Sequence, residues 1–99
     1  MQFSYRYFGE YGNKQEYCCD LYDNDNWIGY CKYYNPSIEH NDAYIEYINI
    51  HEPFRRKGYA TALLKELLCK YDIKWDYRFT EDGRLWYESL IKKQIIDEQ

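Results

Sequence analysis

The chain has 99 residues, of which 45 % are hydrophobic and 30 % charged, and its net charge at pH 7 is −4. This length supports one small domain over residues 1–99 with a single modest core. No apolar run is long enough for a membrane helix and no charged-then-apolar leader precedes a cleavage site, so we expect a cytoplasmic protein. The negative charge disfavours nucleic acid as the main partner and favours a basic partner, such as a lysine-bearing surface or an amine.

The cysteines do not have a metal-binding spacing. They are Cys18, Cys19, Cys31 and Cys69. No C-x-x-C occurs, and the two histidines are distant in sequence, so no metal site is expected. Without a secretory signal we expect these cysteines to be reduced thiols in the core.

The first third of the chain predicts three strands joined by short turns. Aromatic and β-branched residues alternate with polar ones over residues 2–8, 15–22 and 27–34. Residues 9–14 and 23–26 are rich in glycine, asparagine and aspartate, which favours turns. Gly29 indicates a bulge in the third strand. Short turns in succession imply an antiparallel meander.

The middle of the chain predicts a strand and then a helix. Residues 43–50 are rich in β-branched and aromatic residues without a breaker, which is typical of a buried or half-buried strand. Over residues 59–71, apolar positions recur at three- and four-residue spacing and share one helix face, and Asp72 ends the helix. These positions are Ala60, Leu63, Leu64, Leu67, Leu68 and Tyr71.

The last third predicts one more strand and one more helix. Residues 73–79 alternate apolar and polar side chains, and a helix separates them from the fourth strand. The two strands should therefore be parallel neighbours joined by a right-handed crossover. Thr80 is a candidate N-cap for the last helix. The apolar side of that helix is Tyr87, Leu90, Ile91 and Ile95. The fold class is α+β: about four antiparallel strands, a helix, a parallel fifth strand and a C-terminal helix.

A basic turn lies between the fourth strand and the long helix. Arg55, Arg56 and Lys57 place three positive charges there, and Gly58 has no Cβ to block approach to the backbone. The first N–H groups of a helix have no intrahelical partner, so they form an anion site that the helix dipole reinforces. The alternative is a solvated loop with a glycine at a helix start.

The run from Ile48 to Leu64 resembles the acetyl-coenzyme A binding motif of GNAT-superfamily N-acetyltransferases. That motif is a strand ending in an aliphatic residue, a short turn that often contains proline, and Q/R-x-x-G-x-G/A opening a helix with paired leucines. Arg55, Gly58 and Ala60 fill its three defining places. The resemblance implies a GNAT-like fold in which backbone amides of this turn hold the coenzyme's pyrophosphate.

The resemblance assigns the coenzyme to the end of the fourth strand and the turn that follows. The residues are Asn49, Ile50, Arg55, Arg56, Lys57, Gly58, Tyr59, Ala60 and Thr61. A backbone amide near the end of the strand is expected to stabilise the oxyanion. Acetyl-coenzyme A is the expected co-substrate, without a metal.

The last helix also resembles the family, with departures. Tyr87, Glu88 and Leu90 match the family pattern Y-E-x-L-G-F, whereas Ile91 and Lys92 replace its Gly-Phe pair. We expect no early helix pair, because three strands occupy the first third of the chain. We also expect no closing strands, because the chain ends soon after the last helix.

Acetyl transfer needs a base for the amine and an acid for the thiolate. The resemblance assigns Glu46 as base and Tyr87 as acid. Glu46 is expected on the same side of its strand as Tyr44, Ile48 and Ile50, where burial beside aromatic residues would raise its pKa. The alternatives are a solvated strand glutamate and a core tyrosine.

The resemblance therefore implies an N-acetyltransferase that moves acetyl directly from acetyl-coenzyme A to an amine. Without the early helices a small amine would lack walls to orient it, which favours a lysine or N-terminus of a docked protein. A homodimer could supply part of the wall instead. The alternative function is a non-catalytic binding or inhibitory module on the same scaffold, such as a phage-encoded protein acting on a host defence protein.

Overall fold

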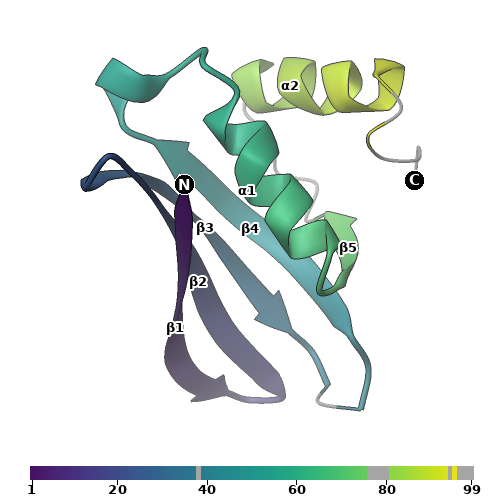
Figure 1. The fold of residues 1–99 in the computed structure, drawn as a ribbon. Helices are drawn as coiled ribbons and strands as arrows, with labels where there is room; N and C mark the ends of the chain where they lie inside the picture. The colour runs from purple at the N-terminus through teal and green to yellow at the C-terminus, as the bar shows by residue number, and fades with distance from the viewer. Residues whose placement is uncertain (38, 76–80, 94, 96–99) are drawn as a thin grey trace.

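The computed structural model describes residues 1–37, 39–75, 81–93 and 95. It contains a five-stranded sheet in the order β1-β2-β3-β4-β5 (Figure 1). The strands are β1 (Gln2–Tyr11), β2 (Lys14–Asp23), β3 (Asn26–Asn35), β4 (Asp42–Ile50) and β5 (Asp72–Trp75). The first four pair antiparallel, and β5 pairs parallel to β4, as expected for a strand reached through a helix. The predicted α+β architecture is confirmed.

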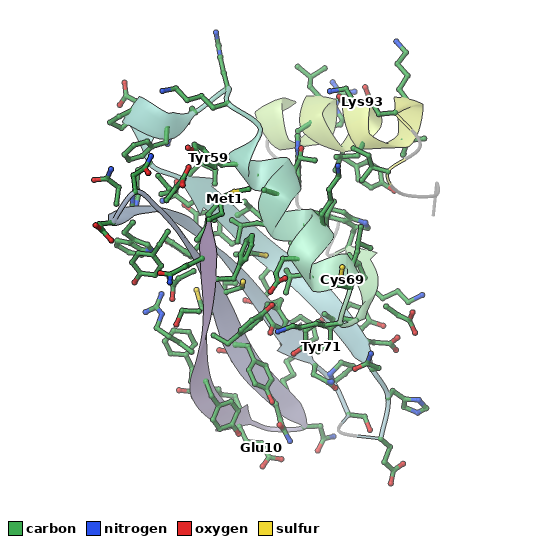
Figure 2. All side chains as sticks on the ribbon, viewed as in Figure 1. Met1, Glu10, Tyr59, Cys69, Tyr71 and Lys93 are labelled. Carbon is green, nitrogen blue, oxygen red and sulfur yellow. The ribbon has the colours of Figure 1, made fainter. Side chains whose placement is uncertain are left out.

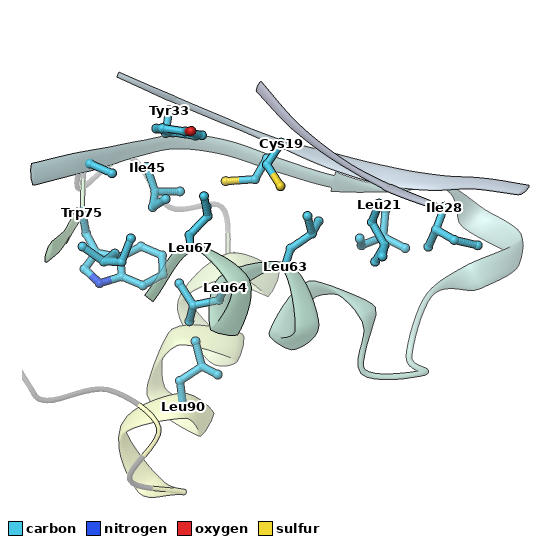
Figure 3. Packing of buried hydrophobic residues seen from close by; sticks show 14 residues of the cluster. Cys19, Leu21, Ile28, Tyr33, Ile45, Leu63, Leu64, Leu67, Trp75 and Leu90 are labelled. Carbon is cyan, nitrogen blue, oxygen red and sulfur yellow. The ribbon is translucent and has the colours of Figure 1, made fainter. Parts of the chain in front are cut away.

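Within the part of the chain that the structure describes, three helical segments follow β4. The 3-10 helix η1 (Glu52–Phe54) leads into α1 (Tyr59–Leu68), which connects β4 to β5, and α2 (Glu81–Lys92) comes last. Figure 3 shows the sheet above and both helices below it, with α2 beyond α1. We call this covered side the helix face. The opposite side carries no helix within the described residues, and we call it the open face.

The core lies between α1 and the helix face. Leu63, Leu64 and Leu67 of α1 are each 0 % exposed, because the three- and four-residue spacing turns them all toward the sheet. Leu90 of α2 joins the same cluster below α1 (Figure 3). The sheet contributes Cys19, Leu21, Ile28, Cys31, Tyr33, Ala43, Ile45, Ile50, Ile73 and Trp75. The core thus fixes α1 along the middle of the sheet.

The first two connections are two-residue hairpin turns. Asn24 and Asp25 have φ of 50° and 64°, the pair of positive values that a type I′ turn needs, and the twist of that turn matches the twist of the strands. The turn between β1 and β2 is only Gly12 and Asn13. The predicted turn over residues 9–14 was therefore too long. The glycine at position 9 belongs to a bulge inside β1 instead, with φ of 108°.

Gly29 lies beside a bulge in β3, as predicted. The register passes from Leu21–Gly29 to Tyr22–Trp27, which leaves Ile28 as the extra residue. A Cβ on Gly29 would lie 2.3 Å from the carbonyl oxygen of Asn49, so only glycine permits this approach of β3 to β4.

The end of α1 departs from the prediction. The helix stops at Leu68 rather than at residue 71, and Leu68 is exposed. Figure 2 shows Cys69 and Tyr71 beyond the helix. The side-chain amide of Asn41 donates to the Lys70 carbonyl, and the Asp72 N–H donates to the Asn41 carbonyl at 2.8 Å. These bonds draw the chain out of the helix and into β5.

The four cysteines differ in their burial. Cys69 is exposed, so the prediction that all four cysteines lie in the core was wrong for that residue. The other three are buried, and burial raises the pKa of each of these thiols. Residues 76–79 of the predicted fifth strand, and Thr80 as an N-cap, lie outside the described residues.

Candidate functional site

The turn before α1 has the geometry of an anion site. Gly58 is the N-cap of α1 and has φ of 83°, a left-handed conformation that glycine adopts without steric cost. A Cβ at Gly58 would meet nothing within 4 Å, so the space above this backbone is open to a ligand. The first helical hydrogen bond runs from the Ala62 N–H to the Gly58 carbonyl at 3.1 Å. The amides of Tyr59, Ala60 and Thr61 therefore have no partner within the helix.

Arg55 holds the turn against the end of β4. Its Nε donates to the Ile50 carbonyl at 2.7 Å, and its backbone N–H donates to the Glu52 carbonyl at 3.2 Å. The side chain is thus fixed in part by the protein. Arg56 and Lys57 are exposed, and Arg56 has φ of 64°. Their charges therefore remain available to an anion in solution.

The β2–β3 hairpin braces the same turn. The Tyr59 hydroxyl donates to Asp23 at 2.8 Å, and the pKa of Tyr59 is raised chiefly by this hydrogen bond. His51 donates from Nδ1 to the Trp27 carbonyl at 2.8 Å, and its ring packs edge-on against the Trp27 ring. These contacts give His51, the first residue after β4, a structural role.

Helix α2 closes the other side of the turn. The indole nitrogen of Trp86 donates to the Thr61 hydroxyl at 3.3 Å. The nine residues predicted to bind the coenzyme thus gather where β4 ends and α1 begins. Of these, Ile50 is buried and Asn49 is half-buried, both at the end of β4.

Glu46 lies on a bulge that the sequence did not reveal. The pairing of β3 with β4 passes from Tyr33–Ile45 to Lys32–Tyr47, leaving Glu46 as the extra residue. The bulge reverses the alternation of the strand. Ile48 and Ile50 therefore pack on the helix face, whereas Glu46 lies on the open face with Tyr44, 3.9 Å from the Lys32 Nζ. The expectation that Glu46 shares a side with Ile48 and Ile50 was wrong.

Tyr87 lies on the helix face, in α2. Its ring packs edge-on against Trp75 of β5, with 5.1 Å between the ring centroids. In the sheet, Trp75 pairs with Ile45, the residue before Glu46. The two candidate catalytic side chains therefore lie on opposite faces of the sheet, one next to Ile45 in β4 and the other against Trp75 of β5. Their roles in catalysis stay predictions.

The open face carries a groove that sequence reasoning missed. Its volume is about 410 Å³, and its lining is Arg6, Phe8, Tyr11, Glu16, Cys18, Trp27, Tyr30 and Lys32. Two of these lining residues donate hydrogen bonds to Asp20, which is 2 % exposed: Arg6 Nε at 2.6 Å and Trp27 Nε1 at 3.1 Å. The alternation of each strand places these residues on one face of the sheet. Which of them contact one another depends on the register between strands, which the sequence does not give.

Among residues 1–37, 39–75, 81–93 and 95, no helix is long and apolar enough to cross a membrane.

Comparisons with known proteins place the chain. No curated protein matches it significantly. The fold is similar to ribosomal-protein-alanine N-acetyltransferase from Brucella melitensis biovar Abortus 2308, with a TM-score of 0.57 and 23 % identity over 80 % of this chain and 62 % of that one. It is also similar to a GNAT family acetyltransferase from Streptococcus pneumoniae TIGR4, with a TM-score of 0.56 and 15 % identity over 86 % and 67 %.

The chain thus spans about two thirds of the length of these neighbours. The model of the Acetyltransferase (GNAT) family matches residues 2–86. This match confirms the resemblance carried by Arg55, Gly58 and Ala60, and the chain belongs to the GNAT acetyltransferase family.

Proposed function

We propose that the protein transfers an acetyl group from acetyl-coenzyme A directly to an amine. The observation that carries the proposal is the start of α1: unpaired amides, an open left-handed glycine and two exposed cations at the end of β4. A pyrophosphate needs several N–H donors and positive charge at close range, and this turn offers both. The family uses acetyl-coenzyme A as co-substrate, which agrees with this chemistry.

The proposed roles follow from where the two candidate side chains lie. The acceptor ammonium gives a proton to Glu46, and the neutral nitrogen attacks the thioester carbonyl carbon from the open face. As the carbon–sulfur bond breaks, the nitrogen gives its second proton to solvent, and Tyr87 gives its proton to the departing thiolate from the helix face. Solvent then returns a proton to Tyr87 and takes one from Glu46. This division is supported by the pairing of β4 with β5. Glu46 follows Ile45, Tyr87 packs against Trp75, and Ile45 and Trp75 are paired in the sheet.

A lysine or N-terminus of a protein is the proposed acceptor. β1 and β2 are joined by two residues, so no helix between them covers the open face. Attack on the thioester needs the nitrogen held near 3–3.5 Å from the carbonyl, which supplies about 7–11 kcal/mol in good cases. A docked protein can provide this positioning, whereas a free small amine cannot. The Brucella neighbour is itself named for a protein acceptor.

A non-catalytic coenzyme-binding module is the second candidate. The ion pair between Glu46 and Lys32 favours it, because a carboxylate already paired with an ammonium has one oxygen fewer to offer an acceptor. The two candidates share the turn from Arg55 to Thr61, which we call the coenzyme turn, and differ in whether they turn over substrate. Mass spectrometry of a lysate incubated with labelled acetyl-coenzyme A separates them: new acetylated amines support the enzyme, and bound coenzyme without them supports the module.

Calorimetry with coenzyme A tests the turn itself. Gly58→Asp places a carboxylate over the amides of α1, and the lost contacts should weaken binding by about 1–3 kcal/mol. Gly12→Asp is the matched control, because Gly12 also has positive φ and open space around its Cβ position but lies in a remote hairpin. Equal coenzyme affinity in the wild type and Gly58→Asp would refute the assignment.

A further inference from the structure

Lys32 lies where an acceptor amine would have to lie. Its Nζ is 3.9 Å from Oε2 of Glu46 and 3.7 Å from Oε2 of Glu16. A base that takes a proton from an amine must lie within hydrogen-bond reach of that nitrogen, or reach it through one water. If Glu46 is the base, the nitrogen it serves occupies the surroundings of the Lys32 Nζ.

From this placement we propose that Lys32 is itself an acetyl acceptor, modified by its own chain. The inference rests on the proposed function, because it uses the same coenzyme turn and the same base. It adds an acceptor that belongs to the protein. Self-acetylation would then replace the Lys32 cation with a neutral amide between Glu16 and Glu46.

The position of Lys32 in the fold supports the proposal. Lys32 pairs with Tyr47 in β4, beside the bulge that turns Glu46 to the open face. Its side chain is 40 % exposed and lines the groove, so its amine is accessible to a thioester bound near this part of β4. Its ion pairs with Glu16 and Glu46 also restrict its position. Glu46 is 24 % exposed, which leaves it room to pass the proton to water.

The reaction balances without a further reagent. The Lys32 ammonium loses one proton to Glu46, and its nitrogen forms a bond to the acetyl carbonyl carbon and then gives its second proton to solvent. The carbon–sulfur bond of acetyl-coenzyme A breaks, and the thiolate takes a proton from Tyr87. Glu46 later releases its proton to solvent, and Tyr87 regains one from it. The products are N-acetyl-Lys32, coenzyme A as thiol and one proton released to solvent.

Two other lysines provide matched controls. Lys70 is 49 % exposed and lies 3.8 Å from Glu66, but it projects from the end of α1, where its Nζ packs over the Tyr5 ring. Lys14 lies at the start of β2, with its Nζ over the ring of Tyr34. Unassisted chemical acetylation would not prefer Lys32 to these residues. Acetylation directed by Glu46 would.

The experiment is a time course of the purified chain with deuterium-labelled acetyl-coenzyme A, read by peptide mass spectrometry. Lys32 should gain label about 100-fold faster than Lys70 or Lys14, the range expected for general-base assistance. The rate per chain should not change when the protein is diluted, because donor and acceptor belong to one molecule. Lys32→Arg should abolish the fast phase, and Lys70→Arg should leave it intact.

A pair of carboxylate variants tests the assignment of the base. Glu46→Gln should slow the labelling of Lys32 by roughly 100-fold. Glu16→Gln removes the nearer carboxylate and should change the rate by only about twofold. Thermal melting of each variant separates a catalytic loss from unfolding. Equal effects of the two variants would assign no special role to Glu46.

A panel of peptide and small amines, run beside the time course, separates this inference from the proposed function. Acetylated amines with unlabelled Lys32 would overturn the inference and leave the function standing. Equal, slow labelling of Lys32, Lys70 and Lys14 would also overturn it. No label on any amine, with coenzyme bound, would overturn both.

Discussion

The two faces of the sheet are held together differently. On the helix face, apolar side chains pack and exclude water, whereas on the open face a few polar side chains contact one another at fixed distances. Leu63, Leu64 and Leu67 fill the first interface without directional bonds. On the other side, Arg6 and Trp27 converge on the buried carboxylate of Asp20. The covered face is therefore tolerant of small shifts in geometry, and the open face is not.

The largest effect is expected on the helix face. Leu64→Ala removes a side chain that is 0 % exposed and leaves a cavity, which should lower the free energy of unfolding by about 2–5 kcal/mol. Urea unfolding measures the change. Leu85→Ala in α2, where the side chain is 53 % exposed, is the control and should be nearly neutral. A small loss in Leu64→Ala would mean that α1 does not pack as described.

The two faces also divide the proposed chemistry. Glu46→Gln on the open face and Tyr87→Phe on the helix face should each lower amine turnover by roughly 100-fold or more. Neither residue is among those proposed to hold the coenzyme, so coenzyme affinity should stay the same. Steady-state kinetics and calorimetry on the same samples give both values. Full activity in both variants would place the acid and base elsewhere.

An intermediate effect is expected from the polar contacts of Asp20. Arg6→Ala leaves the Asp20 carboxylate buried with only the Trp27 indole and the Cys18 thiol near it. The lost charge-assisted bonds should cost about 1–3 kcal/mol. Asp20→Asn should cost less, because Arg6 is half exposed and can be solvated by water. Equal losses of stability in the two variants would mean that leaving the buried Asp20 carboxylate unpaired costs no more than leaving Arg6 unpaired.

Alkaline pH should loosen the helix face gradually. Burial raises the pKa of Cys19 from 9.0 to about 12 and that of Cys31 well above its usual range. Below pH 9 both thiols are neutral in the folded and unfolded chain, so their full contribution to the free energy of unfolding is present. Above pH 9 these thiols lose their protons in the unfolded chain before they do so in the folded chain. Each thiol then lowers the free energy of unfolding by about 1.4 kcal/mol per pH unit, until the pH reaches its pKa in the folded chain.

Melting temperatures measured from pH 7 to pH 10.5 follow this loss. Cys19→Ala should make the decline shallower than in the wild type, whereas Cys69→Ala should not, because Cys69 is exposed. A decline that Cys19→Ala leaves unchanged would exclude this thiol as its source.

Sequence reasoning predicted the helix face well. Spacing along α1 and alternation along the strands identify buried positions directly, because burial on one side imposes a period on the sequence. The order of the strands and the parallel pairing of β5 with β4 followed from the short turns and the single long crossover. The end of α1 was placed too late, because the contacts of Asn41 that stop the helix come from a distant loop.

The open face and the side of Glu46 could not be derived in the same way. One extra residue in β4 reverses every side chain beyond it, and nothing in the alternation of residues 43–50 marks where that residue lies. The turn between β4 and α1, by contrast, lies where Arg55, Gly58 and Ala60 predicted it, since a local motif needs no register. Its binding of the coenzyme stays a prediction. The contacts of Lys32 and Asp20 depend on three strands at once.

The contacts that join the β2–β3 hairpin to the proposed coenzyme turn have a consequence for local opening. His51 bonds to Trp27 and Ile28 through its ring and its backbone, and Tyr59 bonds to Asp23. A hairpin tip fixed at these points can fray only when the turn also releases it. Hydrogen exchange at Asn26 and Trp27 should therefore slow when coenzyme binds, although neither residue is proposed to touch it, and the amides of the β1–β2 hairpin should exchange as before.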